Sequence, residues 1–173
     1  MPCSNSATFN PRKSKIRGLV GCGTGPTDSP MLKALSIRNV VLIERLDLAF
    51  QAGLCVLTGE TGAGKTILLD ALGLALGARA EPNLLRQGND SASVAASFEI
   101  SADHPTNRLL VEHGIEPEDG IVLRRTLNGS GRSRAFINDQ ATSVAMLKRV
   151  GESLVEIQGQ FEQHGLLDST AHL

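Results

Sequence analysis

The sequence contains no tryptophan and no tyrosine, and aromatic residues make up only 3% of its 173 residues. A site that stacks nucleic-acid bases on exposed rings needs several aromatic side chains, so this scarcity argues against that class of binder. No apolar run reaches the ~18 residues of a membrane-spanning helix, and residues 1–30 lack the apolar core of a secretory signal. We therefore expect no membrane span and a cytoplasmic location.

Cysteine is also scarce, and no charge dominates. The three cysteines and four histidines show no metal-ligand spacing, and an odd number of cysteines without a signal peptide favours a reducing compartment. The net charge of −1 gives no strong overall attraction to nucleic acid. Any DNA contact must therefore come from a local basic patch.

The chain divides into two parts by composition. Residues 1–30 are rich in Ser, Gly, Pro and Asn, carry a small Arg/Lys cluster and show no apolar periodicity, so they are predicted to be a disordered extension. This extension is either a nucleic-acid-binding arm or a non-native or mis-assigned start. Hydrophobic residues make up 41% of the whole chain, a value typical of a globular protein. Residues 31–173 have the length of one globular domain.

Alternation and apolar runs predict an α/β fold with an antiparallel β region. Strands are expected at residues 32–41, 42–50, 53–57, 93–100, 121–127, 132–137 and 153–157. Helices are expected at residues 65–76 and 105–113, with a third that Thr142 or Ser143 caps and that runs to about residue 150. Residues 128–131 (Asn-Gly-Ser-Gly) predict a hairpin between two of the strands.

One motif carries specific chemistry, because the sequence matches the pattern G-x-x-x-x-G-K-[ST] in full. Its glycines allow backbone N–H groups to surround a phosphate, and the helix that follows directs its positive end at the same place. The lysine neutralises β- and γ-phosphates and the threonine hydroxyl binds Mg²⁺. These residues predict a P-loop for ATP and Mg²⁺, made by Gly59, Glu60, Thr61, Gly62, Ala63, Gly64, Lys65 and Thr66.

The surroundings of the P-loop resemble the start of SMC-like ABC ATPase heads, and the RecN family most closely. The resemblance rests on residues 35–39, on 43–50, on 57–79 (LTGETGAGKTILLDALGLALGAR), on 131–139 (GRSRAFIND) and on 155–167 (VEIQGQFEQHGLL). It implies a P-loop ATPase head that acts in DNA double-strand-break repair and recombination through ATP-gated engagement of two heads. It covers residues 31–173 and has no counterpart for residues 1–30.

The resemblance also implies a Q-loop glutamine, which in the family reaches the nucleotide's Mg²⁺ and the attacking water. Gln160 is the candidate for this role beside Lys65 in catalysis, and Gln158 is a close rival because its Gln-Gly pair also fits the wider SMC pattern. Four arginines on the expected hairpin are either DNA-phosphate contacts or a solvated basic face: Arg124, Arg125, Arg132 and Arg134.

The family's Walker B acid, signature motif and coiled coil are not found in the sequence. We therefore expect a chain that binds ATP but does not turn it over alone, and that works with the C-terminal half of the head, with a second copy through the heads, and with DNA. An ABC transporter's ATP-binding subunit is the alternative, but it usually places an adenine-stacking aromatic before the P-loop, and residues 37–41 contain none. A small-molecule P-loop kinase is a third alternative that lacks a visible lid or acceptor site.

Overall fold

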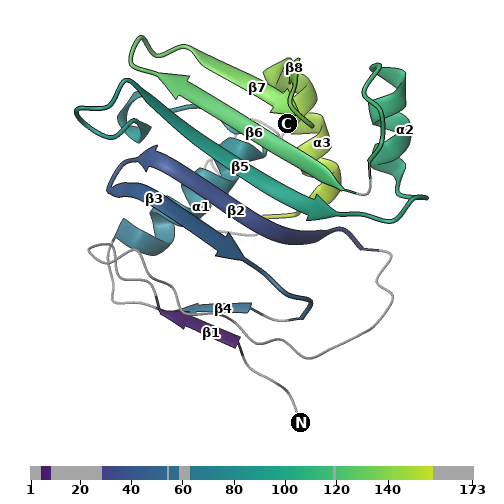
Figure 1. The fold of residues 1–173 in the computed structure, drawn as a ribbon, viewed down its shortest axis with the longest axis horizontal. Coiled ribbons are helices and arrows are strands. Elements are labelled where there is room, and N and C mark those ends of the chain that lie inside the picture. The colour runs from purple at the N-terminus through teal and green to yellow at the C-terminus, as the bar shows by residue number, and fades with distance from the viewer. Residues whose placement is uncertain (1–4, 9–28, 54, 59–62, 119, 158–173) are drawn as a thin grey trace, which may run out of the picture.

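The computed structural model describes the chain apart from residues 1–4, 9–28, 54, 59–62, 119 and 158–173. Its largest element is a six-stranded antiparallel sheet in the order β3-β2-β5-β6-β7-β8. The strands are β2 (Met31–Val40), β3 (Ile43–Ala49), β5 (Ser91–Glu99), β6 (Ile121–Asn128), β7 (Ser133–Ile137) and β8 (Gln140–Thr142). Figure 1 shows these strands as one twisted layer with helices behind it.

Strict alternation gives this sheet one buried and one open face. In β5 every second residue from Ala92 to Phe98 is buried, and in β6 the buried positions are the odd-numbered ones from Ile121 to Leu127. Side chains of neighbouring strands then meet in register, for example Val94 opposite both Ile37 and Arg125. The buried side of the sheet forms one continuous apolar layer.

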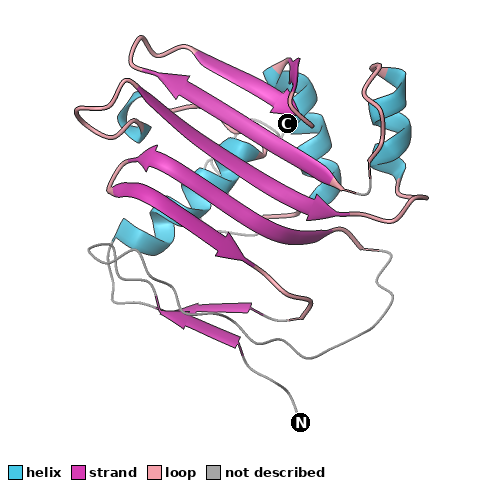
Figure 2. Cartoon of the chain, in the orientation of Figure 1, coloured by secondary structure: helices cyan, strands magenta, loops and turns pink. Residues whose placement is uncertain are grey.

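Two helices cover the buried face. The helix α1 (Ala63–Ala75) contacts β2, β5 and β6, and α3 (Val144–Leu154) contacts β7. A third helix, α2 (Pro105–Glu112), packs against α3, and a short 3₁₀ helix η1 (Pro82–Leu84) follows α1. Figure 2 shows the helices on one side of the sheet, and no described helix lies on the other side.

Glycines bring the end of α1 against α3. A Cβ built on Gly151 would lie 2.6 Å from the Leu76 carbonyl oxygen, and one built on Gly77 would lie 2.6 Å from the Lys148 backbone. Gly77 also has a φ of +93°, which a side chain rarely adopts. The two helices therefore approach at backbone distance, which fixes the direction of α1 relative to the sheet.

A second, smaller sheet lies below the first in Figure 1. It consists of β4 (Cys55–Thr58), the strand that leads to the P-loop, and β1 (Asn5–Thr8), which pairs with it in parallel. The prediction of disorder throughout residues 1–30 is therefore wrong for residues 5–8, which form a strand. Residues 5–8 are Asn-Ser-Ala-Thr, so the sequence carried no apolar pattern from which a strand here, or its pairing with β4, could be predicted.

Most other predicted elements are confirmed within two residues of their expected ends. Ser143 caps α3, as one of the two candidates: its Oγ accepts a hydrogen bond from the Met146 N–H at 3.1 Å. The strand expected at residues 153–157 is wrong, because α3 continues to Leu154. Val150 and Leu154, four residues apart, are both buried on one face of this helix, so the start of the apolar run belongs to α3, and residues 155–157 follow it without regular secondary structure.

Candidate functional site: the P-loop and its surroundings

The P-loop lies between a strand and a helix, as its chemistry requires. β4 ends at Thr58 and α1 begins at Ala63, and Gly59 to Gly62 between them lie outside the described residues. Gly64, Lys65 and Thr66 occupy the first turn of α1. The N–H groups of a helix's first turn have no partner inside the helix and attract an anion.

The described part of the motif fits a phosphate ligand. Lys65 is half-buried and Thr66 is exposed, so the threonine hydroxyl is open to a ligand at the helix start. The first turn of α1 contains no acidic side chain that would repel one. A cation and a hydroxyl at a helix N-terminus suit a nucleotide phosphate with its divalent metal ion.

The body of α1 is positioned by its apolar side. Ile67, Leu68, Ala71, Leu74 and Ala75 are buried against the sheet. Asp70 lies on the half-buried flank of the helix, where burial and then the negative charge of Glu81 raise the pKa of its carboxyl group. The helix therefore has a rigid, one-sided attachment to the antiparallel sheet.

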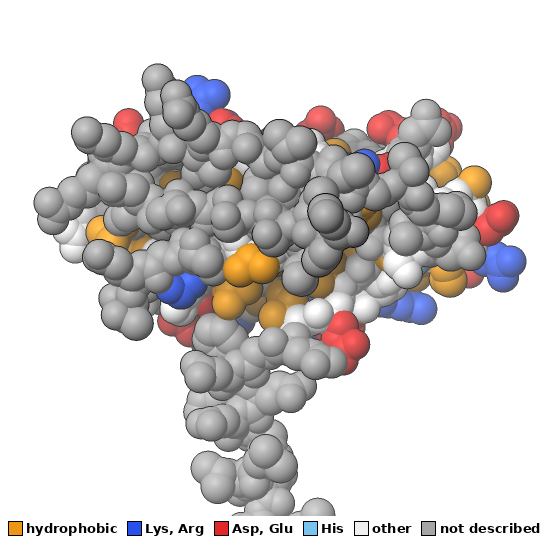
Figure 3. All heavy atoms as spheres, turned by 90° about the horizontal axis from the view of Figure 1, so that it is seen from below, with side chains coloured by type: hydrophobic (Ala, Val, Ile, Leu, Met, Phe, Trp, Pro, Cys, Tyr) orange, Lys and Arg blue, Asp and Glu red, His pale blue; other side chains and the backbone are white. Residues whose placement is uncertain are grey.

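The other side of α1 and β4 is not covered by described residues. Leu69 on α1 is 46% exposed and Val56 on β4 is 39% exposed, although strands in parallel pairs are ordinarily buried on both faces. Hydrophobic side chains form part of the surface seen from this side, next to residues that are not described (Figure 3). This is the region in which the P-loop strand would need further strands to complete a layered α/β body.

Both Q-loop candidates, Gln158 and Gln160, lie outside the described residues. The assignment of Lys65, Thr66 and Gln160 to catalysis and Mg²⁺ binding accordingly stays a prediction. No group of three metal-binding side chains occurs among the described residues. Within that same part of the chain, no helix has the length and apolarity to cross a membrane.

The four hairpin arginines do not form one cluster. Arg125 points to the buried face and is only 3% exposed, whereas Arg132 and Arg134 are exposed. Arg124 is held on the open face, 4.4 Å from the Phe136 ring centroid and 2.7 Å from an Asp139 carboxylate oxygen. The parity of the buried positions in residues 121–127 would have revealed the inward direction of Arg125.

The open face also carries a charged group that the sequence did not reveal. Arg38 and Arg45, from β2 and β3, both contact Asp47, at 2.6 Å and 3.2 Å. Burial opposes ionisation of Asp47, but hydrogen bonds from Ser36, Arg38 and Arg45 outweigh it and lower the pKa of its carboxyl group. Cross-strand register alone brings these residues together.

An antiparallel sheet beside a strand–P-loop–helix unit is the fold of the ABC-type P-loop heads. In agreement, the structure resembles a solved SMC ATPase described for ATP-driven dimerization and DNA-stimulated activation (TM-score 0.60, 18% identity, covering 80% of this chain and 92% of that one). It also resembles the recombination mediator RecF bound to an ATP analogue (TM-score 0.56, 18% identity, covering 69% and 30%). At these identities the likeness concerns the fold.

Residues 34–165 match the family model described as an AAA domain, and the chain belongs to this family. The particular proteins it resembles are DNA repair proteins RecN, whose N-terminal segment it matches. It is 39% identical to the Haemophilus influenzae protein over 146 residues and 42% identical to the Halalkalibacterium halodurans protein over 144 residues. Each match covers 83% of this chain and 26% of the relative, so the chain spans about a quarter of the relatives' length.

Proposed function

We propose that this chain is the ATP-binding half of a RecN-type head, acting in DNA double-strand-break repair and recombination. The observation that carries the proposal is the P-loop at residues 59–66 between β4 and α1, in a chain 39–42% identical to RecN proteins. The fold is shared by many P-loop proteins with different functions. The resemblance to RecN proteins favours DNA repair among these functions.

In this proposal the P-loop residues divide the work of holding ATP and Mg²⁺. The backbone N–H groups of residues 59–64 bind the β-phosphate, Lys65 neutralises the β- and γ-phosphates, and the Thr66 hydroxyl is a ligand of Mg²⁺. Bound Mg²⁺ supplies charge neutralisation for phosphoryl transfer. Gln160, with Gln158 as rival, orients the attacking water.

The partner of the P-loop region is the C-terminal half of the head. The exposed Val56 and Leu69 lie on the elements that another half would have to cover, since β4 has only β1 as a described strand partner. That half brings the acid that helps hold Mg²⁺, and a second head brings the signature donors across the nucleotide. A homodimer through engaged heads, contact with DNA and a cytoplasmic location belong to the same proposal.

An ABC transporter subunit is the alternative with the same fold. Such subunits stack adenine on an aromatic residue before the P-loop. The corresponding strand β2 carries aliphatic, small and charged side chains but no aromatic one. This difference and the RecN relatives favour repair.

The test is reconstitution of ATP hydrolysis. The chain alone should bind ATP and release negligible phosphate, because phosphoryl transfer depends on charges placed around the γ-phosphate and one such donor is worth ~10³–10⁵ in rate. Addition of the separately expressed C-terminal half of a RecN head should restore hydrolysis, and duplex DNA should alter its rate.

Two controls make this decisive. Lys65→Ala in the mixture should abolish hydrolysis, whereas Lys33→Ala, in the ion pair with Glu99 on the sheet, should not. Robust hydrolysis by the isolated chain would contradict the half-head proposal and favour a kinase-like or GTPase-like P-loop protein.

A further inference from the structure

A buried guanidinium without enough partners is the least satisfied group of the sheet. Arg125 is 3% exposed and faces the apolar layer beside Leu123 and Leu127. Its Nη2 donates a hydrogen bond to Ser133 Oγ at 2.8 Å, but its buried Nε and Nη1 have no hydrogen-bond partner among the residues that the structure describes. Burial lowers the pKa of Arg125, yet an arginine stays charged, and a buried cation is costly without an anion nearby.

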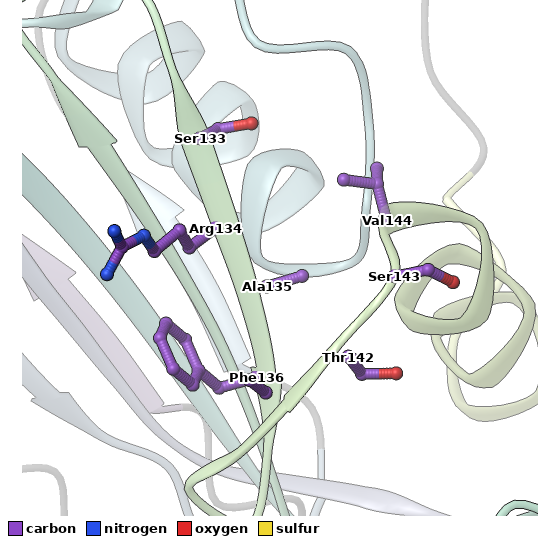
Figure 4. A pocket seen from close by; sticks show the side chains of 8 residues that line it. Ser133, Arg134, Ala135, Phe136, Thr142, Ser143 and Val144 are labelled. Carbon is purple, nitrogen blue, oxygen red and sulfur yellow. The ribbon is translucent and has the colours of Figure 1, made fainter.

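Ser133 connects this cation with the surface. Arg125 pairs with Ala135 across the strands, and Ser133 is its diagonal neighbour on the same face of β7. Because Ser133 Oγ accepts from Arg125, its own hydroxyl proton is available to a second acceptor. Figure 4 shows this hydroxyl on the side of β7 that faces the start of α3, across a shallow pocket of about 410 Å³.

The backbone at Ser133 also faces this pocket. Asn128 N–H donates to the Arg132 carbonyl and Asn138 N–H to the Val122 carbonyl, which makes the even-numbered residues of β7 the hydrogen-bonded partners of β6. The odd-numbered Ser133 therefore directs its N–H and C=O to the other edge. There β8 pairs only with Ala135 to Ile137, so no described strand covers this edge at Ser133.

The opposite wall of the pocket is the N-terminus of α3. Thr142, Ser143 and Val144 line it, and Ser143 uses its side chain to cap the Met146 N–H, which leaves earlier N–H groups of the first turn without a helical partner. Arg134 also lines the pocket, but Figure 4 shows its side chain directed to the opposite side of β7 from Ser133. The pocket has no acidic lining residue. Arg125 does not line the pocket itself but reaches it through Ser133. Hydroxyls and helix N–H groups around a space without a carboxylate, with a buried cation behind one of the hydroxyls, favour an anion.

We propose that this pocket binds a phosphate group, held by the Ser133 hydroxyl and N–H together with the first turn of α3, with Arg125 behind Ser133 as the buried positive charge. Ser133 is the contact residue and Arg125 acts through it. The phosphate belongs either to a nucleic-acid backbone, a source that rests on the proposed repair function, or to a free phosphate or small phosphorylated ligand.

The test is a titration of the full chain with inorganic phosphate at constant ionic strength, in which binding is measured by the chemical-shift changes of backbone amides in NMR spectra. Phosphate should shift the amides of Ser133, Val144 and Ala145 saturably. Ser133→Ala and Arg125→Met should each weaken this binding about tenfold, the size expected for a charge-assisted hydrogen bond. Ser133→Thr, which keeps the hydroxyl, should retain binding, and Ser93→Ala on the open face is the matched control.

Thermal melting separates binding from folding. Replacement of a buried, underpaired charge by an apolar side chain of similar volume is often neutral or stabilising, so Arg125→Met should fold. If it does not fold, Ser133→Ala alone decides. Shifts that are absent, or equal in Ser133→Ala and the unsubstituted chain, would overturn the proposal.

A second arm identifies the source of the phosphate. With a DNA duplex, Ser133→Ala should reduce affinity several-fold and lower the magnitude of the log–log salt slope by about one if the pocket holds a backbone phosphate. Unchanged DNA binding with weakened phosphate binding assigns the pocket to a free phosphate or phosphorylated ligand. The repair function is tested separately by DNA-responsive hydrolysis of the reconstituted head, which can fail while the phosphate titration succeeds.

Discussion

The antiparallel sheet and the P-loop unit differ in how completely their strands are paired and their apolar side chains are buried. The sheet pairs six strands in register, and its inner face is covered by α1 and α3. Among the described strands the P-loop strand β4 has one short parallel partner, and Val56 on β4 and Leu69 on α1 are substantially exposed. Parallel strands are normally protected on both faces, so among the described residues the P-loop unit is less completely covered than the antiparallel sheet.

The largest expected effect separates the two regions by binding. Lys65→Ala should lower ATP affinity by about 100-fold, because it removes the cation that faces the β- and γ-phosphates. It should leave the unfolding midpoint of the sheet unchanged, since Lys65 lies at the start of α1 and outside the buried core. Isothermal titration with an ATP analogue and Mg²⁺ measures the first effect, and calorimetry the second. Undiminished affinity would refute the P-loop assignment.

The next effect concerns the close contact between the end of α1 and α3. Gly151→Ala should reduce the free energy of unfolding by roughly 1–3 kcal/mol, because a Cβ there would lie 2.6 Å from the Leu76 carbonyl oxygen. Gly73→Ala is the matched control: its Cβ would meet Ala78 at an ordinary 3.7 Å and should stabilise α1 by up to ~1 kcal/mol. Chemical denaturation of both variants measures the two changes in the free energy of unfolding. If both substitutions raised or both lowered it, the close packing of α1 against α3 at Gly151 would be contradicted.

A smaller, local effect is expected from removal of residues 1–30. None of the six strands of the large sheet pairs with β1, so the unfolding midpoint should stay constant. Amide exchange at residues 55–58 should become faster, because β1 is the described strand that pairs with β4. Hydrogen exchange by mass spectrometry distinguishes the two regions directly. Faster exchange throughout β5 and β6 would show that the regions are coupled.

The smallest effect is the pH dependence of Asp70. Its folded-state pKa lies above the ordinary value of 3.8, so the folded chain holds this proton more strongly than the unfolded chain. Stability due to Asp70 should therefore fall as pH rises from 3.8 through the raised folded pKa, and then stay level. Because Asp70 is only partly buried and water screens its charge, Asp70→Asn should raise stability at neutral pH by only a few tenths of a kcal/mol.

Glu81→Gln is the companion variant, since Glu81 is the second cause of the raised pKa. It should reproduce part of the gain from Asp70→Asn. Denaturation curves at acidic and neutral pH measure both. Lower stability of Asp70→Asn at neutral pH would contradict the direction of the shift.

The sequence by itself determined the local elements and the chemistry of one loop. The apolar patterns of the chain predicted strands at β5 and β6, and the Asn-Gly-Ser-Gly segment predicted the hairpin that joins β6 to β7. The P-loop pattern predicted a strand before the loop and a helix after it. These properties depend on neighbours in the chain. Steric preferences and a period of two or 3.6 residues are enough to reveal them.

Tertiary structure alone decided which distant residues meet. Arg38, Arg45 and Asp47 form a group through strand register, and Ser133 lines the same pocket as the start of α3, at a position of β7 with which β8 does not pair. The pairing of β1 with β4, and the end of α3 at Leu154 rather than a strand, likewise depended on packing partners. Short segments gain or lose structure by what covers them, and that coverage is set by the whole fold rather than by local sequence.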